Sequence, residues 1–352
     1  MEDEKKSTHR AEVVAVKLEP HGNADSLSIV RVYGYQVVVR TADWKDGDLA
    51  AYIVPDSFVP DAPEYAYLNP KGALRDTDRR IRVRRFRGQM SQGLLVKAPV
   101  GSKAGDDVSD ILGITRYEPG EPGTGSGSNL GKVRTYMSPK CFVPKYDVEN
   151  WYRYGALTFK DGEQVIISEK LHGCNARYVY SSRDCEFFAG SRSQWIARTS
   201  VVPEKTRWRR LLRFLRIIPP MLKTNDSVWW RIIEQHPEIE QWCCDHPDTA
   251  LFGEIYGDVQ DLKYGHEKGC VSFAAFNTYK AGTYGFEWDH CSGIPEAPIV
   301  YRGVYSDAVV RSHIDGPTLI YDADHCREGI VIHTLDGRHL KAVSDIYLER
   351  AK

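Results

Sequence analysis

A stretch rich in glycine, serine and proline at residues 118–131 most constrains how this chain can fold. Such a composition is typical of a linker, because glycine and serine favour no regular structure and proline interrupts helices and strands. The pattern stays irregular up to about residue 150. We therefore predict two domains, at residues 1–117 and 151–352, that are joined by a linker over residues 118–150.

The composition excludes several classes of protein. Hydrophobic residues make up 42% and charged residues 27% of the 352 positions, which is typical of a soluble globular protein. The net charge is −1, so a nucleic-acid-binding surface must be a local patch. No apolar run is long enough to cross a bilayer and the N-terminus is charged, so we expect no membrane partner and no signal peptide. The 8 cysteines form no Cys-x-x-Cys pair, which favours reduced thiols in the cytoplasm over a zinc site.

The first domain has the pattern of a small β-barrel. Short runs of strand-forming residues are separated by turns at Tyr33-Gly34 and Asp46-Gly47. The predicted strands are Glu12–Glu19, Leu27–Val32, Tyr35–Arg40 and Leu49–Val54. The spacing predicts an OB-like barrel, and the loop His21–Leu27 resembles a loop of tRNA-binding OB-type modules.

A basic segment in this domain is the candidate nucleic-acid surface. Seven arginines lie between residues 75 and 87, with Ile81, Val83 and Phe86 among them. Alternation in a strand would place Arg80, Arg82 and Arg84 on one face, with Ile81 and Val83 on the other. Such a face can neutralise phosphates, whereas the alternative is a charged edge strand that prevents aggregation. We predict nucleic-acid contacts from Arg79, Arg80, Arg82, Arg84 and Arg85.

The second domain is organised around Lys170. The apolar run Val165–Ile167 predicts a core strand, and a cluster of functional groups follows it: Glu169, Lys170, His172, Gly173, Asn175 and Arg177. A lysine at the end of a buried strand is costly unless it is paired or used chemically. A partly desolvated lysine can lose its proton and act as a nucleophile. The alternative is a surface hairpin with Lys170 in water.

The remaining pattern of this domain indicates an α+β fold. A basic amphipathic helix is predicted over residues 205–218, and a second helical stretch over residues 227–244 is interrupted at Pro237. Further strands are predicted at Thr249–Tyr256, Val271–Tyr279, Glu328–Thr334 and Arg338–Val343.

Charged residues inside these apolar strands are candidate ligand contacts. Glu254, Glu328 and Lys341 each need a partner or a ligand if they are buried. Two carboxylates suit a divalent cation, and lysine and arginine suit a polyphosphate. Phe276 can stack on a base, although the commoner role of such a residue is plain core.

Six short motifs occur in the order found in ATP-dependent RNA ligases. They are Glu169–Asn175, Ser191-Arg192, Phe252-Gly253-Glu254, Phe273–Phe276, Glu328–Val331 and Leu340-Lys341. Together with the N-terminal module, the linker and the sequence at residues 259–265, these motifs resemble the Deinococcus-type RNA ligases over nearly the whole chain. Because only 11 residues follow Lys341, the OB-like part is expected before the nucleotidyltransferase domain. One departure is Val343, which stands where comparable ligases often have a second lysine.

The resemblance implies a mechanism and a set of site residues. Lys170 would carry AMP from ATP, and Mg²⁺ or Mn²⁺ would be held by Glu254 and Glu328, unless one of these acids binds the ribose. His172 and Gly173 would shape the phosphate pocket, and Phe276 would contact adenine. The other expected nucleotide contacts are Glu169, Leu171, Asn175, Arg192 and Lys341. The implied partner is a nicked duplex with RNA at its 3′-hydroxyl end, and no obligate protein partner is evident.

Two other functions fit the same residues. A capping-type guanylyltransferase uses the same lysine chemistry with GTP, and a nucleotide-preference assay separates it from a ligase. A non-catalytic RNA-binding protein with a degenerate ligase-like domain would also keep the fold. The intact set of Lys170, Glu254, Glu328 and Lys341 argues against the second.

Overall fold

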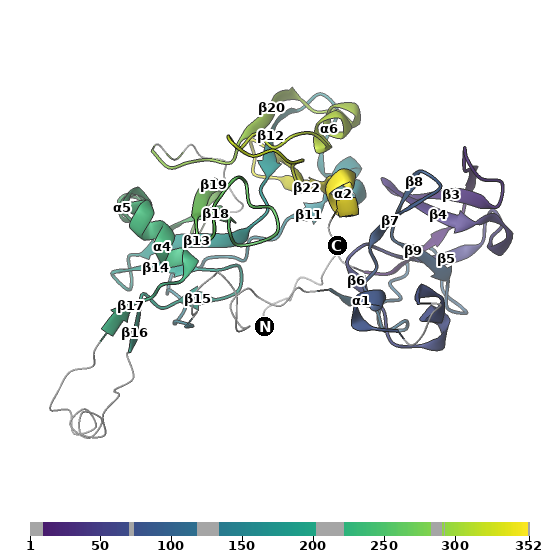
Figure 1. Cartoon of the computed structure of the whole chain (residues 1–352), viewed down its shortest axis with the longest axis horizontal. Coiled ribbons are helices and arrows are strands. Elements are labelled where there is room, and N and C mark those ends of the chain that lie inside the picture. Colours follow the sequence, from purple (N-terminus) through teal and green to yellow (C-terminus); the bar gives the residue numbers. More distant parts are fainter. Residues whose placement is uncertain are drawn as a thin grey trace, which may run out of the picture. The chain divides into compact units, whose positions relative to one another are not determined.

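The computed structural model describes residues 10–69, 74–117, 134–201, 222–282, 291 and 293–350. The chain divides into two compact units, whose elements are labelled in Figure 1. The first unit comprises Met1–Pro119, Glu149–Phe159 and Ala342–Lys352, and the second comprises Gly120–Val148 and Lys160–Lys341. The predicted linker stretch 118–131 and basic helix 205–218 lie outside the described residues. Within the described residues, no helix is long and apolar enough to span a membrane.

The first unit is built mainly from two small antiparallel sheets. One has the order β1-β5-β9, with β1 (Glu12–Ala15), β5 (Leu49–Ile53) and β9 (Leu94–Lys97). The other has the order β2-β3-β4, with β2 (Leu18–Pro20), β3 (Leu27–Val32) and β4 (Tyr35–Arg40). Alternate residues of β4 are buried, because one face of its sheet packs on a core that includes Val30, Val37 and Tyr52.

Short elements complete this unit. Two further pairs are β6 (Ser57–Phe58) with β10 (Thr115–Arg116), and β7 (Val83–Phe86) with β8 (Gln89–Gln92). The helical turns are η1 (Thr41–Asp43), η2 (Pro63–Leu68) and α1 (Asp76–Arg79). From later parts of the chain come β11 (Glu149–Asn150), α2 (Trp151–Thr158) and α7 (Asp345–Arg350).

The grouping of α2 with the first unit differs from the expected domain boundary at residue 151. Arg153 forms an ion pair with Glu12 in which the side chains are only 5% and 8% exposed. The Tyr152 ring packs 5.4 Å from the Tyr35 ring, and the Gly34 N–H donates to the Tyr152 carbonyl at 2.7 Å. These contacts between distant residues tie α2 to the strands of the first unit.

Removing the charge of Glu12 is expected to destabilise the first unit strongly. Glu12→Gln leaves the buried Arg153 guanidinium without its carboxylate, and breaking such a pair costs about 3–5 kcal/mol. The control is Glu19→Gln, whose pair with Arg31 is exposed and is worth no more than about 1 kcal/mol. Hydrogen exchange of the backbone amides in β1 and α2 measures the loss of stability in both variants. Equal protection in the two variants would contradict this prediction.

The arginine segment differs from the single strand that was predicted. Arg79 ends the helical turn α1, and Arg80 forms an isolated antiparallel β-bridge with Phe58. Strand β7 begins only at Val83. The reason is that the Ile81 N–H donates to the Ser57 carbonyl, which holds this backbone against β6. The expected alternation in burial is nevertheless present, because Ile81 and Val83 are buried while the arginines between and after them are more exposed.

The second unit contains a five-stranded antiparallel sheet of order β15-β14-β13-β18-β19. Its strands are β13 (Cys174–Ser181), β14 (Glu186–Gly190), β15 (Trp195–Ile196), β18 (Thr249–Gly257) and β19 (Val271–Lys280). Helices α4 (Val228–Gln235) and α5 (Pro237–Asp245) bury Trp229, Ile232 and Ile239 against one face (Figure 1). The predicted break at Pro237 is confirmed, because proline begins a new helix readily but cannot continue one.

A second antiparallel arrangement carries the lysine strand. Its order is β22-β21-β12-β20, with β12 (Gln164–Lys170), β20 (Ile299–Val304), β21 (Gly329–Thr334) and β22 (His339–Val343). The remaining elements are α6 (Asp307–Ile314) and the pair β16 (Thr199–Val201) and β17 (Leu222–Thr224). In the register of β12 with β21, Lys170 faces Gly329, which brings Glu328 beside the end of the lysine strand.

Candidate active site

A cleft in the second unit collects most of the predicted site residues. The cleft opens to solvent, and about 680 Å³ of space not filled by protein atoms lies within it and its mouth. The strands β12, β13, β18, β19, β21 and β22 contribute most of its lining: Ser168, Glu169, Lys170, Asn175, Glu254, Phe276, Val331, His333 and Lys341, and Leu171 follows β12 directly. Connecting segments add Tyr146, Asp147, Val148, Arg192 and Ala297. Residues from six strands therefore meet around the predicted nucleophile.

Lys170, which lines the cleft, is paired with Glu328. Its Nζ atom lies 2.6 Å from Oε1 of Glu328, and the two side chains are 25% and 11% exposed. Burial raises the pKa of Glu328, but the charges and hydrogen bonds of Lys170 and His172 outweigh burial and hold that pKa well below its ordinary value. Glu328 is therefore a carboxylate at neutral pH. This geometry excludes the surface hairpin in which Lys170 points into water.

His172 and Gly173 form the turn that follows Lys170. His172 Nδ1 lies 3.4 Å from Oε2 of Glu328. Burial lowers the pKa of His172, but the hydrogen bond and the charge of Glu328 outweigh burial, so the net pKa is higher than its ordinary value. Only glycine fits at position 173, because a Cβ atom there would lie 2.0 Å from the carbonyl oxygen of Ile255 in the neighbouring strand β18.

Glu254 and Asn175 lie opposite each other on β18 and β13. Burial is the main reason that the pKa of Glu254 is raised, to about 8; Lys170 opposes this shift and Glu328 adds to it. The Oδ1 atom of Asn175 is buried and has no hydrogen-bond partner among the described residues. Glu254 therefore offers a mostly neutral carboxyl group, and Asn175 offers an amide oxygen that can still accept a hydrogen bond.

One wall of the cleft is aromatic. The Tyr146 ring packs 4.7 Å from Phe276 and stacks on His339 at 5.1 Å with an interplanar angle of 2°. The Tyr146 hydroxyl donates to Oδ1 of Asn277 at 2.7 Å. Burial lowers the pKa of His333 to about 3, so its ring is neutral, and its Nε2 lies 3.2 Å from Ser168 Oγ. This wall can stack on a planar base.

The sequence did not indicate every residue of this wall. Tyr146 was assigned to the linker, and no local signal links it to Phe276. His333, by contrast, lies two residues after Val331 in a predicted strand. The strand period of two could therefore have placed both on the face that lines the cleft.

Glu169, a predicted nucleotide contact, has its carboxylate occupied. Oε1 accepts a hydrogen bond from Thr318 Oγ1 at 2.5 Å, and Oε2 accepts one from the Leu319 N–H at 2.7 Å. Burial raises its pKa despite these donors. Arg192 is half-exposed and pairs with Asp147 at 2.9 Å, so it lines the cleft with a carboxylate beside it.

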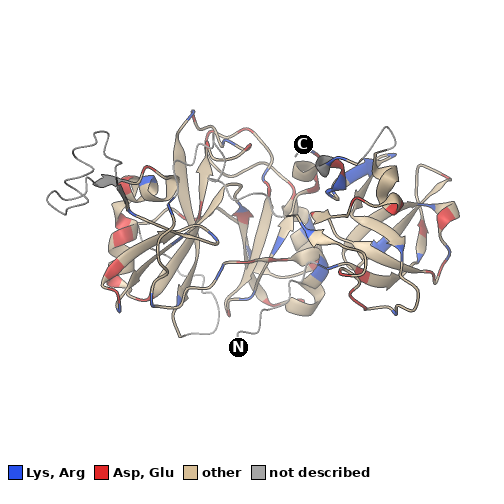
Figure 2. Ribbon diagram, turned by 90° about the horizontal axis from the view of Figure 1, so that it is seen from below, with Lys and Arg blue, Asp and Glu red and all other residues tan. Residues whose placement is uncertain are grey.

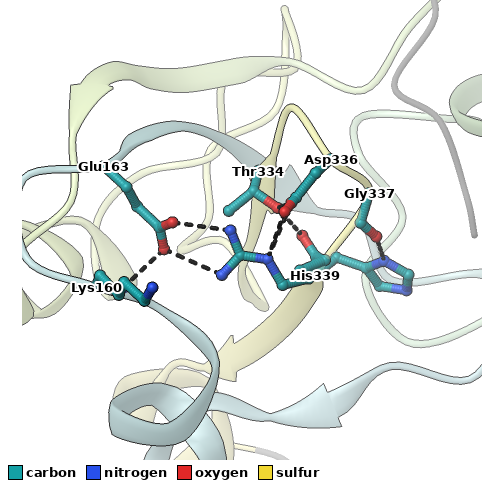
Figure 3. Close-up of polar contacts among 7 residues, drawn as sticks. Lys160, Glu163, Thr334, Asp336, Gly337 and His339 are labelled. Carbon is teal, nitrogen blue, oxygen red and sulfur yellow. Dashed lines mark hydrogen bonds and ion pairs between the residues drawn. The ribbon is translucent and has the colours of Figure 1, made fainter.

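The turn between β21 and β22 is fixed by the charged network drawn in Figure 3. Arg338 Nη2 lies 2.8 Å from Oε2 of Glu163, and its Nε lies 2.9 Å from Oδ2 of Asp336. The Glu163 carboxylate also accepts the Lys160 N–H at 2.8 Å. The network ties the start of β22 to the turn before β12, and β22 then carries Lys341 to the cleft.

The donor set fits a divalent cation that keeps much of its own water. Within the part of the chain that the structure describes, no group of three or more His, Cys, Asp or Glu side chains could enclose a metal ion. Glu254 and Glu328 nevertheless line one buried corner beside the unsatisfied Asn175 oxygen. Mg²⁺ is commonly held by one or two carboxylates, water and substrate phosphates, and this corner can supply the protein's part.

Comparisons with known proteins agree with this fold. A family model described as an OB-fold domain matches residues 11–98, and one described as RNA ligase matches residues 163–349. A search of curated proteins found no match. The structure of Naegleria gruberi RNA ligase with PPi aligns with a TM-score of 0.76 and 23% identity, over 98% of this chain and 99% of that chain. A mutant of that ligase with ATP and Mn aligns with a TM-score of 0.75 and 23% identity, over 97% and 98%.

The RNA ligase model matches more than half of the chain, so this chain belongs to the RNA ligase family. It is therefore an enzyme that acts on nucleic acid, as the order of the six motifs predicted. The expected fold class, an N-terminal OB-like domain followed by an α+β domain of antiparallel sheets, is also confirmed.

Proposed function

We propose that this RNA ligase uses ATP to seal breaks between a 3′-hydroxyl and a 5′-phosphate through an AMP group carried on Lys170. The observation that carries the proposal is the position of Lys170 Nζ. It lies in a cleft lined by polar and aromatic side chains, 2.6 Å from a buried carboxylate. ATP as the nucleotide is also supported by the Naegleria ligase structures that contain ATP or AMP together with Mn.

In the first step, the Lys170 amine attacks the α-phosphorus of ATP. The new bond joins Nζ to the α-phosphorus, the bond from that phosphorus to the α,β-bridging oxygen breaks, and pyrophosphate leaves. Lys170 must lose a proton before attack, since only the neutral amine carries the lone pair. Glu328 holds Nζ in place in the resting protein, and a change of partner by Glu328 would release the amine.

Glu254 and Glu328 are the residues that would hold Mg²⁺ or Mn²⁺, directly or through water. A bound cation offsets charge on the α-phosphate and the leaving group. The environments of the two acids differ, because Glu328 is ionised whereas Glu254 has a pKa raised to about 8. Glu328 is therefore the better metal ligand, and Glu254 is suited to hydrogen-bond a ribose hydroxyl.

The other cleft residues have roles in binding the nucleotide. Phe276 and the Tyr146 ring beside it suit the adenine base. Arg192 and Lys341 line the cleft as cations and suit the phosphates, while the Asn175 oxygen suits a hydroxyl donor. Leu171 lines the cleft next to Lys170, and the carboxylate of Glu169 is engaged elsewhere, so any contact from Glu169 would come from its backbone.

In the second step, AMP passes from Lys170 to the 5′-phosphate of the nucleic acid, which forms a phosphoanhydride and frees the lysine. In the third step, the 3′-hydroxyl attacks that phosphate and AMP leaves. We propose a nicked duplex with a ribonucleotide at the 3′-hydroxyl side as the substrate. Four nicked duplexes with ribose or deoxyribose on each side of the nick test this. Equal sealing with a 3′-deoxyribonucleotide would contradict the proposed preference.

The first unit is proposed to bind the nucleic acid through its arginine segment, whose basic residues are blue in Figure 2. Three of the five predicted arginines already have partners. Arg79 donates to the Val59 carbonyl, Arg80 pairs with Asp56, and Arg85 pairs with Glu349 of α7. Arg84 is exposed, and no partner for it exists among the described residues. Phosphate contact is therefore expected mainly from Arg84, with Arg87 beside it.

Arg84→Ala is expected to weaken binding of nicked duplex without changing the formation of the AMP adduct. Losing one phosphate contact should reduce the slope of log affinity against log salt by about 1. Filter binding over a series of salt concentrations measures the slope. Arg31→Ala is the control, because Arg31 is exposed but occupied by Glu19. An unchanged slope in Arg84→Ala would remove this arginine from the proposed interface.

A further inference from the structure

The turn that follows Lys170 is held by a segment that comes 87 to 92 residues later in the chain. Three side chains of residues 258–265 reach it. Gln260 Nε2 donates to the Gly173 carbonyl, and Tyr264 accepts the His172 backbone N–H at 2.7 Å. Asp261 Oδ1 lies 2.5 Å from His172 Nε2. These contacts all lie within the second unit.

The holding segment is itself anchored. Asp258 binds Lys263 Nζ at 2.5 Å and the Gly269 N–H at 2.8 Å. Tyr264 is 2% exposed, and Gly265 has a φ of 75° and approaches the Asp322 carbonyl too closely for a side chain. The segment is therefore held in place at both ends, by the bonds of Asp258 at one end and by the buried Tyr264 and the closely packed Gly265 at the other.

His172 lies between two carboxylates, one on each ring nitrogen. Nε2 contacts Asp261, and Nδ1 is 3.4 Å from Glu328, which in turn is 2.6 Å from Lys170 Nζ. Asp261 is the outermost of these groups: its side chain is 63% exposed, whereas those of His172 and Glu328 are nearly buried. A solvent-facing carboxylate is thus connected to the nucleophile through one imidazole.

We propose that Asp261 is a positioning residue for the transfer of AMP to Lys170. By accepting the Nε2–H hydrogen bond, it fixes the rotation of the imidazole and keeps Nδ1 directed toward Glu328 and the lysine. Contact with Glu328 alone would not be enough, since that carboxylate is expected to engage a metal ion when ATP binds. This inference deepens the proposed function and rests on it.

The test is the rate of adduct formation in a single turnover at saturating α-labelled ATP and Mg²⁺. Asp261→Ala is expected to lower the rate constant by about 10- to 100-fold, the usual effect of removing a group that orients a reacting residue. The ATP concentration for half-saturation should change by less than about threefold, since Asp261 lies behind His172. Asp261→Asn keeps an acceptor oxygen and should recover most of the rate.

Two controls separate positioning from a merely structural role. Glu267→Ala removes an exposed carboxylate from the same stretch of chain and should leave the rate unchanged. In a His172→Ala background, Asp261→Ala should cause no further loss, because its effect passes through the imidazole.

Each outcome decides the proposal. An Asp261→Ala enzyme with the normal rate would overturn it, and so would an equal loss with and without His172. Loss of rate in both the alanine and asparagine variants together with a lowered melting temperature would assign Asp261 a structural role. Failure of the wild-type protein to form any adduct would instead overturn the proposed function, and this inference with it.

Discussion

Lys170→Ala is expected to abolish both the labelled AMP adduct and the sealing of 5′-phosphorylated nicks. Its Nζ atom forms the bond to phosphorus in the proposed first step and lies 2.6 Å from Oε1 of Glu328. Loss of a nucleophile typically lowers turnover by a factor of at least ~10³. Denaturing electrophoresis after incubation with α-labelled ATP measures the adduct.

A substrate that already carries AMP on its 5′-phosphate provides the control for this variant. Such a substrate bypasses the first two steps, so Lys170→Ala should still join it to a 3′-hydroxyl. Sealing of the adenylylated end shows that the variant is folded and that the loss is confined to lysine chemistry. A labelled adduct in Lys170→Ala would exclude Lys170 as the nucleophile.

Glu328→Gln is expected to have the next largest effect. The substitution keeps the shape of the side chain but removes the charge that pairs with Lys170 and faces His172. It also removes the better of the two proposed metal ligands. Removal of one well-placed electrostatic group commonly costs about 10²- to 10³-fold in rate, and we expect a loss of that size in adduct formation.

The half-saturating Mg²⁺ concentration gives a second measure of the same variant. It should rise in Glu328→Gln if this carboxylate contributes to metal binding. Glu234→Gln on α4 is the matched control, because Glu234 is exposed on a helix that does not line the cleft. An adduct-forming rate in Glu328→Gln equal to that of the control would contradict the role assigned to Glu328.

Periodicity and isolated charges predicted much of the candidate site. Lys170, Glu254 and Glu328 were selected because each is a charged residue at or within an apolar strand, and the structure places all three around one cleft. The strands were predictable because the period of two is local. The break at Pro237 was predictable for the same reason, since it depends on one residue and its neighbours.

What the sequence could not supply was pairing between distant segments. The register that sets Asn175 opposite Glu254 joins two residues that lie 79 positions apart in the sequence. The ion pairs of Arg80 with Asp56 and of Arg85 with Glu349 also depend on the folded chain. The local sequence therefore does not show that acidic side chains neutralise these two arginines. Tyr146 and Asp261 belong to connecting segments, where no periodic pattern marks a functional side chain.

The most direct test of the central claim is to map the site of the covalent nucleotide. Purified protein is incubated with α-labelled ATP or GTP and Mg²⁺, denatured, digested and analysed by mass spectrometry. The proposed mechanism predicts AMP from ATP, attached to the peptide that contains Lys170, and little or no label from GTP. A GMP adduct on Lys170 would indicate a guanylyltransferase, and no adduct from either nucleotide, in protein shown not to be adenylylated beforehand, would favour an RNA-binding protein without ligase chemistry.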